Sequence, residues 1–118
     1  MDQLMQQFKK GVFELLVLKL LSQADCYGYQ LIQLLAEQSK GAFALKEGTL
    51  YPILYRLEDQ GLVESYWSED DPSHKRAKRK KYYHITHTGQ EKLRHMMVTW
   101  LEFERDVNQV LRSEKTEN

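Results

Sequence analysis

The stretch that decides the fold is residues 46–63, which read KEGTLYPILYRLEDQGLV. Its aliphatic residues recur three to four positions apart, at Leu50, Ile53, Leu54 and Leu57. This spacing puts them on one face of a helix over about residues 47–60, with that face toward a core. Gly61 closes the predicted helix. We place Pro52 in its first turn, where a missing N–H has no intrahelical partner to lose.

The opposite face of this helix carries the side chains that we predict to meet a partner: Lys46, Thr49, Tyr51, Pro52, Tyr55 and Arg56. A helix N-terminus offers free N–H groups to phosphate, and Thr49 and Tyr51 would add hydroxyl donors. Arg56 would reach a guanine edge or a phosphate. In the alternative, Tyr51 and Tyr55 are half-buried and only pack.

Two predicted helices come earlier in the chain. Apolar residues are dense over residues 4–21, so this helix has to be covered on more than one side. After a turn at residues 22–28, a helix over about 29–38 ends at Gly41, which suits a left-handed conformation. We expect a short strand at residues 42–45. The second and third helices then form a helix-turn-helix.

Residues 62–67 and 81–86 are rich in β-forming side chains and predict a hairpin. A hairpin that follows a helix-turn-helix is a wing. Six of the seven positions from 75 to 81 are cationic although the whole chain has no net charge: Lys75, Arg76, Lys78, Arg79, Lys80 and Lys81. Such a run favours contact with phosphates, the alternative being a solvated basic loop.

A last helix is predicted from a cap at Thr88, with Glu91 completing a capping box, to about Arg112. Large apolar residues alternate three and four apart along it. Together with the first helix they exceed what one small domain covers, which predicts a homodimer. The expected dimer residues are Phe8, Val12, Leu93, Met96, Trp100, Phe103, Val107 and Val110. Core packing is the alternative for part of this stripe.

The predicted fold class is therefore mainly α with a small β-hairpin. Residues 1–86 form a winged helix-turn-helix DNA-binding domain, with residues 1–22 also contributing to the dimer, and residues 87–118 form the dimerisation helix. Aromatic and methionine side chains at the seam predict a pocket for a planar aromatic effector. The residues that we expect to line it are Phe13, Met96, Met97 and Trp100.

Other function classes find little support in the sequence. We see no nucleophile motif and no glycine-rich phosphate loop, so an enzyme is not expected and no cofactor is implied. His84, His87 and Cys26 give at most a weak metal hypothesis. The single cysteine and the lack of a signal peptide or a long apolar run favour the cytoplasm, with no membrane partner. The main rival function is a winged-helix module that binds proteins instead of DNA.

Three stretches resemble the PadR family of bacterial transcriptional regulators. Residues 46–63 resemble its recognition helix, residues 79–86 with Thr88–Gly89 look like its second wing strand and the start of its last helix, and residues 27–31 (YGYQL) are similar to its second-helix opening. A single C-terminal helix resembles the smaller subgroup, which includes multidrug-sensing repressors.

The resemblance implies a homodimer that binds a double-stranded operator through Thr49, Tyr51 and the wing. It also implies that a small molecule can release this dimer from the operator. In drug-sensing relatives, a tryptophan from each last helix sandwiches a planar aromatic drug. Trp100 stands where that residue would be, and Glu104, one turn further, would favour cationic drugs. The wing is longer and more polar than the family pattern. The expected function is a ligand-responsive, dimeric repressor.

Overall fold

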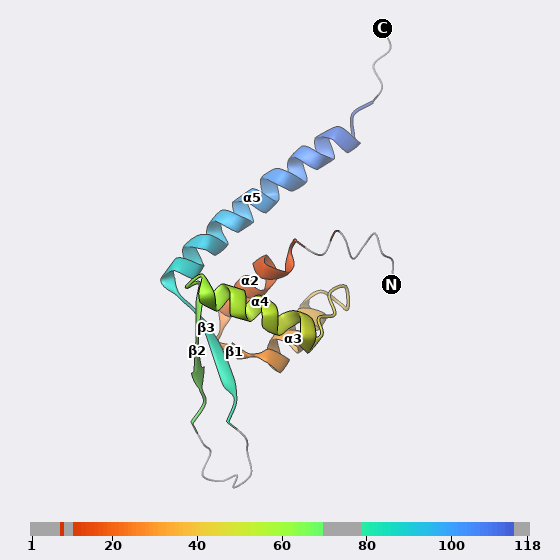
Figure 1. Cartoon of the computed structure of the whole chain (residues 1–118). Helices are drawn as coiled ribbons and strands as arrows, with labels where there is room; N and C mark the ends of the chain where they lie inside the picture. Colours follow the sequence, from red (N-terminus) through yellow and green to blue (C-terminus); the bar gives the residue numbers. More distant parts are fainter. Residues whose placement is uncertain (1–7, 9–10, 70–78, 115–118) are drawn as a thin grey trace.

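The computed structural model describes residues 8, 11–69 and 79–114 of the 118-residue chain. Within these residues the elements are α2 (Phe13–Gln23), β1 (Cys26–Tyr27), α3 (Gly28–Gln38), α4 (Glu47–Asp59), β2 (Val63–Trp67), β3 (Lys81–Ile85) and α5 (His87–Leu111) (Figure 1). The three strands form an antiparallel sheet in the order β1-β3-β2. The mainly helical fold with a small hairpin is thus confirmed. No helix of the described ranges combines the length and hydropathy that a membrane span needs.

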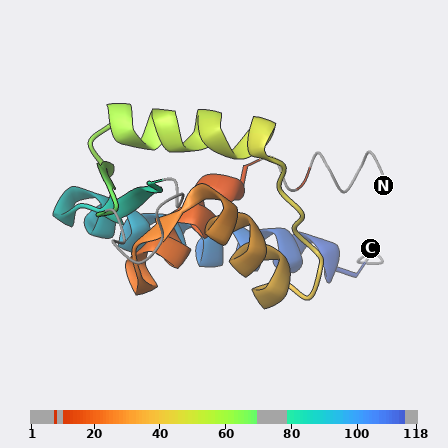
Figure 2. The same cartoon turned by 90° about the horizontal axis from the view of Figure 1, so that it is seen from below.

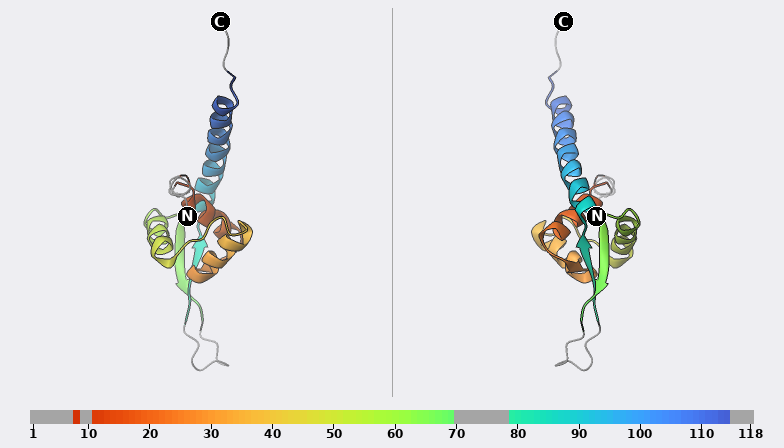
Figure 3. Two further views of the ribbon diagram at one scale, coloured as in Figure 1. Left: turned by 90° about the vertical axis from the view of Figure 1, so that its right-hand side faces the viewer. Right: turned by 90° about the vertical axis from the view of Figure 1, so that its left-hand side faces the viewer.

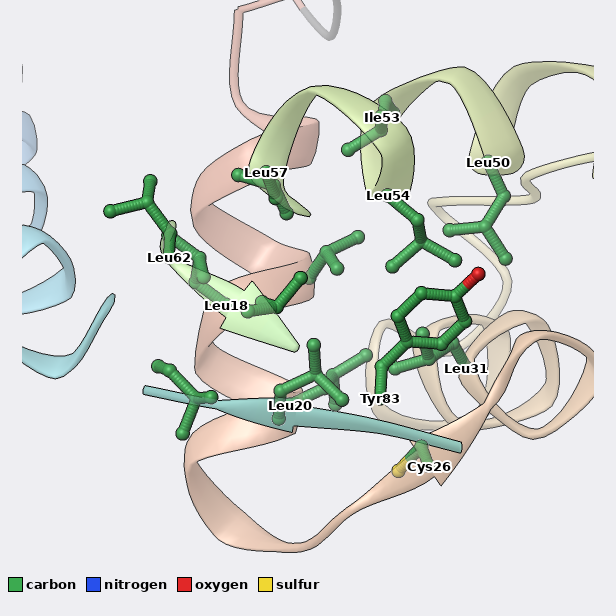
Figure 4. Close-up of a cluster of buried hydrophobic side chains, with 14 of the residues drawn as sticks. Leu18, Leu20, Cys26, Leu31, Leu50, Ile53, Leu54, Leu57, Leu62 and Tyr83 are labelled. Carbon is green, nitrogen blue, oxygen red and sulfur yellow. The ribbon is translucent and has the colours of Figure 1, made fainter. Parts of the chain in front are cut away.

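The core lies between α2, α3, α4 and the inward face of the sheet (Figure 4). The four aliphatic residues predicted to face inward from α4 are all buried: Leu50, Ile53, Leu54 and Leu57. Tyr83 points its ring from β3 toward Leu54 and Leu50 in Figure 4. Burial, with the negative charge of Glu58, raises the pKa of Tyr83 to about 12. The α4 helix is therefore fixed against the sheet by side chains that its periodicity identified.

The turn between α3 and α4 depends on left-handed backbone at Lys40 (φ 53°) and Gly41 (φ 85°). The Gly41 N–H donates to the carbonyl of Ala36 at 2.8 Å and closes α3, as predicted for this glycine. The strand predicted at residues 42–45 is wrong, because these residues form a loop. Phe43 packs edge-on against Phe13, with their ring centroids 6.0 Å apart. The third strand is β1, which lies in the segment predicted as a turn and pairs with β3 through Cys26↔Tyr83.

Two further predictions are wrong, the unbroken first helix and the place of Pro52, whereas α4 begins at Glu47 as predicted. The first helix does not run unbroken from residue 4, since a turn at Gly11 and Val12 precedes the start of α2 at Phe13. Glycine is a poor helix former, which explains the break. Pro52 is the sixth residue of α4 and not in its first turn. The carbonyl that it leaves without a donor belongs to Gly48, which is exposed to water.

The last helix is capped by Thr86 and not by Thr88. The Thr86 hydroxyl accepts a hydrogen bond from the Gly89 N–H at 3.0 Å and donates one to the Gly61 carbonyl at 2.7 Å. Gly89 packs so closely on Leu62 that a Cβ would collide with the Leu62 carbonyl oxygen. This close approach fixes the first turn of α5 against the start of β2, and it explains why α5 begins earlier than expected.

The hairpin strands were predicted correctly. Strands β2 and β3 pair from Val63↔Ile85 to Trp67↔Lys81, and a bond from Ser68 N–H to the Lys80 carbonyl (2.8 Å) extends the ladder. The hairpin and α5 leave the domain at opposite ends (Figures 1 and 3). The predicted wing-tip cations Lys75, Arg76 and Lys78 lie outside the described residues.

Candidate nucleic-acid interface and apolar pockets

The N-terminal end of α4 is exposed and has no side-chain cap. Lys46 is the N-cap residue, and its side chain makes no cap hydrogen bond to the first turn. Lys46, Thr49 and Pro52 are all exposed, as the helical periodicity predicted. Figure 2, seen from below the hairpin, shows α4 set along one side of the domain. The first-turn N–H groups, the Lys46 amine and the Thr49 hydroxyl can therefore meet a phosphate.

The two tyrosines of α4 differ in burial. Tyr51 is half-buried and packs closely on Gly28. A Cβ added to Gly28 would lie only 2.5 Å from the hydroxyl oxygen of Tyr51. Burial, with the negative charge of Glu47, raises the pKa of Tyr51, so its hydroxyl stays a donor. Tyr55 is exposed, with its ring 6.2 Å from that of Tyr51. Tyr51 thus packs against the start of α3, while Tyr55 stays open to a partner.

Arg56 lies at the other end of α4. Its Nε is 3.2 Å from Oε1 of Glu14 on α2, and both side chains are partly exposed. Ten residues of helix, or about 15 Å along the axis, separate Arg56 from Lys46. The structure therefore joins Arg56 to α2 and does not bring it together with Lys46 and Thr49.

Three of the predicted wing cations are described, and they stand where β2 and β3 reach their open end. Arg79 Nε donates to the Ser68 carbonyl at 3.1 Å. Lys80 Nζ lies 4.3 Å above the ring of Tyr27, and Lys81 Nζ lies 5.7 Å from the ring of Tyr83. These contacts hold the two ammonium groups beside aromatic rings of the sheet, so that the described end of the hairpin is cationic.

The outward face of the sheet carries a cluster that the sequence analysis missed. Asp25 accepts a hydrogen bond from the Tyr66 hydroxyl at 2.6 Å and is 2.8 Å from Nδ1 of His84. Partial burial raises the pKa of Asp25, but the hydrogen bonds from Tyr66 and His84, with the imidazole charge, outweigh burial and lower it overall. The bond to Asp25 raises the pKa of Tyr66 to about 12. Strand alternation could have placed Tyr66 and His84 on this face, but nothing in the sequence pointed to Asp25.

Two apolar pockets lie between α2 and α5. One, of about 460 Å³, is lined by Phe8, Val12, Leu15, Leu16, Lys19, Phe43, Met97, Trp100 and Leu101. The other, of about 560 Å³, is lined by Phe8, Gly11, Val12, Leu15, Lys92, His95, Met96, Thr99, Trp100 and Phe103. Four residues line both pockets: Phe8, Val12, Leu15 and Trp100. The predicted ligand residues Met96 and Met97 line one pocket each, whereas Phe13 and Glu104 line neither.

Beyond its first turns, α5 exposes a long apolar run. The exposed residues are Met97, Val98, Trp100, Leu101, Phe103, Val107, Val110 and Leu111. Leu93, which we predicted at the dimer interface, is only 6% exposed and belongs to the core of the protomer. The rings of Trp100 and Phe103 are 6.2 Å apart. The surface left for a partner thus begins about one turn after Leu93.

His84 and His87, two of the three residues of the weak metal hypothesis, make other contacts. His87 Nε2 is 3.0 Å from Glu91 on the same helix, and His84 contacts Asp25. Burial, with the negative charge of Asp25, raises the pKa of the Cys26 thiol and so disfavours the thiolate that a metal would need. In the part of the chain that is described, no three side chains of the metal-binding types come together.

A helix-turn-helix with an open α4 N-terminus, followed by a hairpin with a cationic end, defines a winged-helix DNA-binding protein. The sequence model of the transcriptional regulator PadR-like family matches residues 17–95. The chain belongs to this family of DNA-binding transcriptional regulators.

Individual relatives agree with this assignment. A PadR family transcriptional regulator from Eggerthella lenta shares 32% identity and a TM-score of 0.79, over 92% of this chain and 89% of its own. A PadR-like transcriptional regulator from Bacillus cereus shares 33% identity and a TM-score of 0.76, over 92% and 99%. The transcriptional regulator YqjI of Escherichia coli is 34% identical over 56 residues, which are 48% of this chain and 27% of YqjI. These relatives are regulators and not enzymes.

Proposed function

We propose that the protein is a homodimeric repressor that binds a double-stranded operator and is released by a planar, largely apolar ligand. The observation that carries the proposal is the position of Trp100, which lines both pockets and also belongs to the exposed apolar run of α5. One residue is thus available both to a second copy of the chain and to a ligand. Occupation of promoter DNA by such a dimer would repress transcription.

The exposed run of α5 supports the dimer. This helix has 25 residues, or roughly 37 Å of length, and its distal part extends beyond the rest of the domain (Figure 1). Soluble monomers rarely expose a continuous apolar surface of this kind. A second copy that packs along α5 and the start of α2 would cover the run.

The same dimer would suit DNA. Because α5 and the hairpin leave the domain at opposite ends, pairing through α5 leaves the α4 N-terminus and the hairpin of each copy free (Figure 3). A symmetric pair would then present two binding units to half-sites about one helical turn apart. Arg79, Lys80 and Lys81 would supply phosphate contacts beside those of Lys46 and Thr49.

The pockets support ligand control. Their volumes fall within the range of small-molecule sites, roughly 300–1,000 Å³, and their walls are apolar and aromatic. The ionisable side chains on their linings are Lys19, Lys92 and His95, without a carboxylate among the described lining residues. These charges favour a neutral or anionic ligand over the cationic class that Glu104 suggested. A ligand wedged between α2 and α5 would change the spacing of the two DNA-binding units, and so would favour the DNA-free state.

Tryptophan fluorescence tests the ligand site. The chain has two tryptophans, so a Trp67→Phe variant leaves Trp100 as the only tryptophan. We expect the anionic dye anilinonaphthalene sulfonate to quench Trp100 emission saturably and to lower the affinity of this variant for duplex DNA. The cationic dye acridine orange, tested for quenching alone, should quench less. If neither dye quenches Trp100 emission saturably, the ligand site is refuted. If sedimentation shows that the protein is a monomer at micromolar concentration, the dimer is refuted.

A further inference from the structure

One carboxylate contacts both strands of the hairpin. Asp25 precedes β1, and its two oxygens face different strands: Oδ2 accepts from the Tyr66 hydroxyl on β2 (2.6 Å), and Oδ1 is 2.8 Å from His84 Nδ1 on β3. We call Asp25, Tyr66 and His84 the Asp25 clasp. A residue far from the hairpin in sequence is thereby joined to it at two points.

The contacts of the clasp continue toward the cationic end of the hairpin. The ring of Tyr82 stacks on that of Tyr66 at 5.7 Å and meets that of Tyr27 edge-on at 5.5 Å. Lys80 Nζ then lies 4.3 Å above the Tyr27 ring. Packed rings therefore connect the Asp25 clasp to a cation that belongs to the predicted DNA contact.

A second attachment holds the hairpin on the side of α4. The Ser65 hydroxyl donates to Glu58 Oε2 at 2.6 Å, which joins β2 to the last turns of α4. The hairpin is therefore held from both faces, by Glu58 on the inside and by Asp25 on the outside. These two attachments add to the pairing of β3 with β1 and to the buried side chains of the hairpin, and together they fix its direction from both faces.

We propose that Asp25 is a positioning residue for DNA binding. The clasp sets the direction of the hairpin relative to α4, so that the wing cations and the α4 N-terminus meet the same duplex. The role acts through Tyr66 and His84 and needs no contact between Asp25 and DNA. It rests on DNA binding by the winged helix and not on the dimer or on the ligand.

The clasp also gives DNA binding a specific pH dependence. Histidine side chains gain a proton between about pH 8 and pH 5, and a charged imidazole strengthens the bond to an ionised carboxylate. The hydrogen bonds that lower the pKa of Asp25 keep it ionised across this range. Among the described residues, the other ionisable groups on this face are Glu64, which is the cross-strand neighbour of His84, and the phenols of Tyr66 and Tyr82. Lys80 lies further along the face, over the ring of Tyr27. A protonated His84 would therefore hold Asp25 more tightly than a neutral one.

The test uses the full chain and a fluorescein-labelled duplex of about 30 base pairs, which spans two half-sites. Asp25→Asn removes one negative charge, and by charge alone it should tighten DNA binding. The clasp predicts the opposite sign, a loss of about 1.5- to 5-fold, which is the range for an exposed ion pair. The matched control is Glu64→Gln, which removes a negative charge beside His84 but leaves both contacts of Asp25 in place, and which should bind as well as wild type or better.

The pH profile separates positioning from mere support of folding. We expect wild type to gain more affinity between pH 8 and pH 6 than Asp25→Asn does, and also more than His84→Gln does. Tyr66→Phe, which loses only a hydroxyl, should also weaken binding and guards against misfolding of the Asp25 variant. If Asp25→Asn binds as tightly as Glu64→Gln, or keeps the wild-type pH profile, the proposal is wrong. If the wild-type protein does not bind DNA at all, the proposed DNA-binding function itself is refuted.

Discussion

Replacing Phe103 by alanine should weaken the proposed dimer. Phe103 is 60% exposed on α5, and its ring lies beside that of Trp100. A phenylalanine buries roughly 150–250 Å² when covered, so that roughly 90–150 Å² remains for a partner to cover. At about 25 cal/mol per Å² this area is worth roughly 2–4 kcal/mol for each copy. A symmetric dimer contains the residue twice.

Not all of this free energy is lost on truncation, because alanine keeps its Cβ and the partner can relax. If half is lost, the dimer is weakened by at least about 2 kcal/mol, which is about a 30-fold increase in the dissociation constant. Sedimentation velocity over a dilution series from tens of micromolar to tens of nanomolar measures this change.

The matched control is Tyr29→Ala. Tyr29 is 55% exposed on α3, away from α5, so its loss should leave the dissociation constant unchanged while removing a similar area. Equal dissociation constants for wild type and Phe103→Ala would show that this face of α5 is not the interface. An effect of Tyr29→Ala as large as that of Phe103→Ala would mean that general stability is being measured.

Three further results are expected. Gly89→Ala should lower the free energy of unfolding by about 1–3 kcal/mol in urea melts, because a Cβ collides with the Leu62 carbonyl; an unchanged midpoint would contradict the close packing of α5. Gly28→Ala should push Tyr51 away from α3 and weaken duplex binding by up to about tenfold, or about 1.4 kcal/mol, while the dimer persists; duplex binding equal to that of wild type would contradict this role of Tyr51. Since the folded-state pKa of Asp25 is below its usual 3.8, its contribution to stability is present above that value and is lost as the pH falls through the folded pKa. Acid melts should therefore show less loss of stability below pH 4 for Asp25→Asn than for wild type, and parallel curves would contradict this.

Local periodicity predicted most of the winged helix. The inward face of α4 and the exposure of Lys46 and Thr49 followed from a repeat of 3.6 residues, and β2 and β3 followed from runs of β-forming residues. These features depend on neighbours in sequence, so the sequence alone contains the information.

The features that were missed depend on contacts between distant segments. The β1 strand exists because Cys26 pairs with Tyr83, and the start of α5 is set by Gly89 against Leu62. The Asp25 clasp joins residues 41 and 59 positions apart. Composition and spacing give no signal for such pairs, so their identification needed the three-dimensional arrangement.

The most direct test of the central claim is a titration of the protein against duplex DNA at several salt concentrations. If α4 and the hairpin bind phosphates, log affinity should fall linearly with log salt, with a slope of about −0.9 for each phosphate contacted. The triple variant Arg79→Ala/Lys80→Ala/Lys81→Ala should bind less tightly, with a slope shallower by up to about 2.7 for each hairpin engaged. No binding in dilute buffer would contradict a DNA-binding winged helix and favour a protein partner. So would an affinity that changes neither with the salt concentration nor in the triple variant.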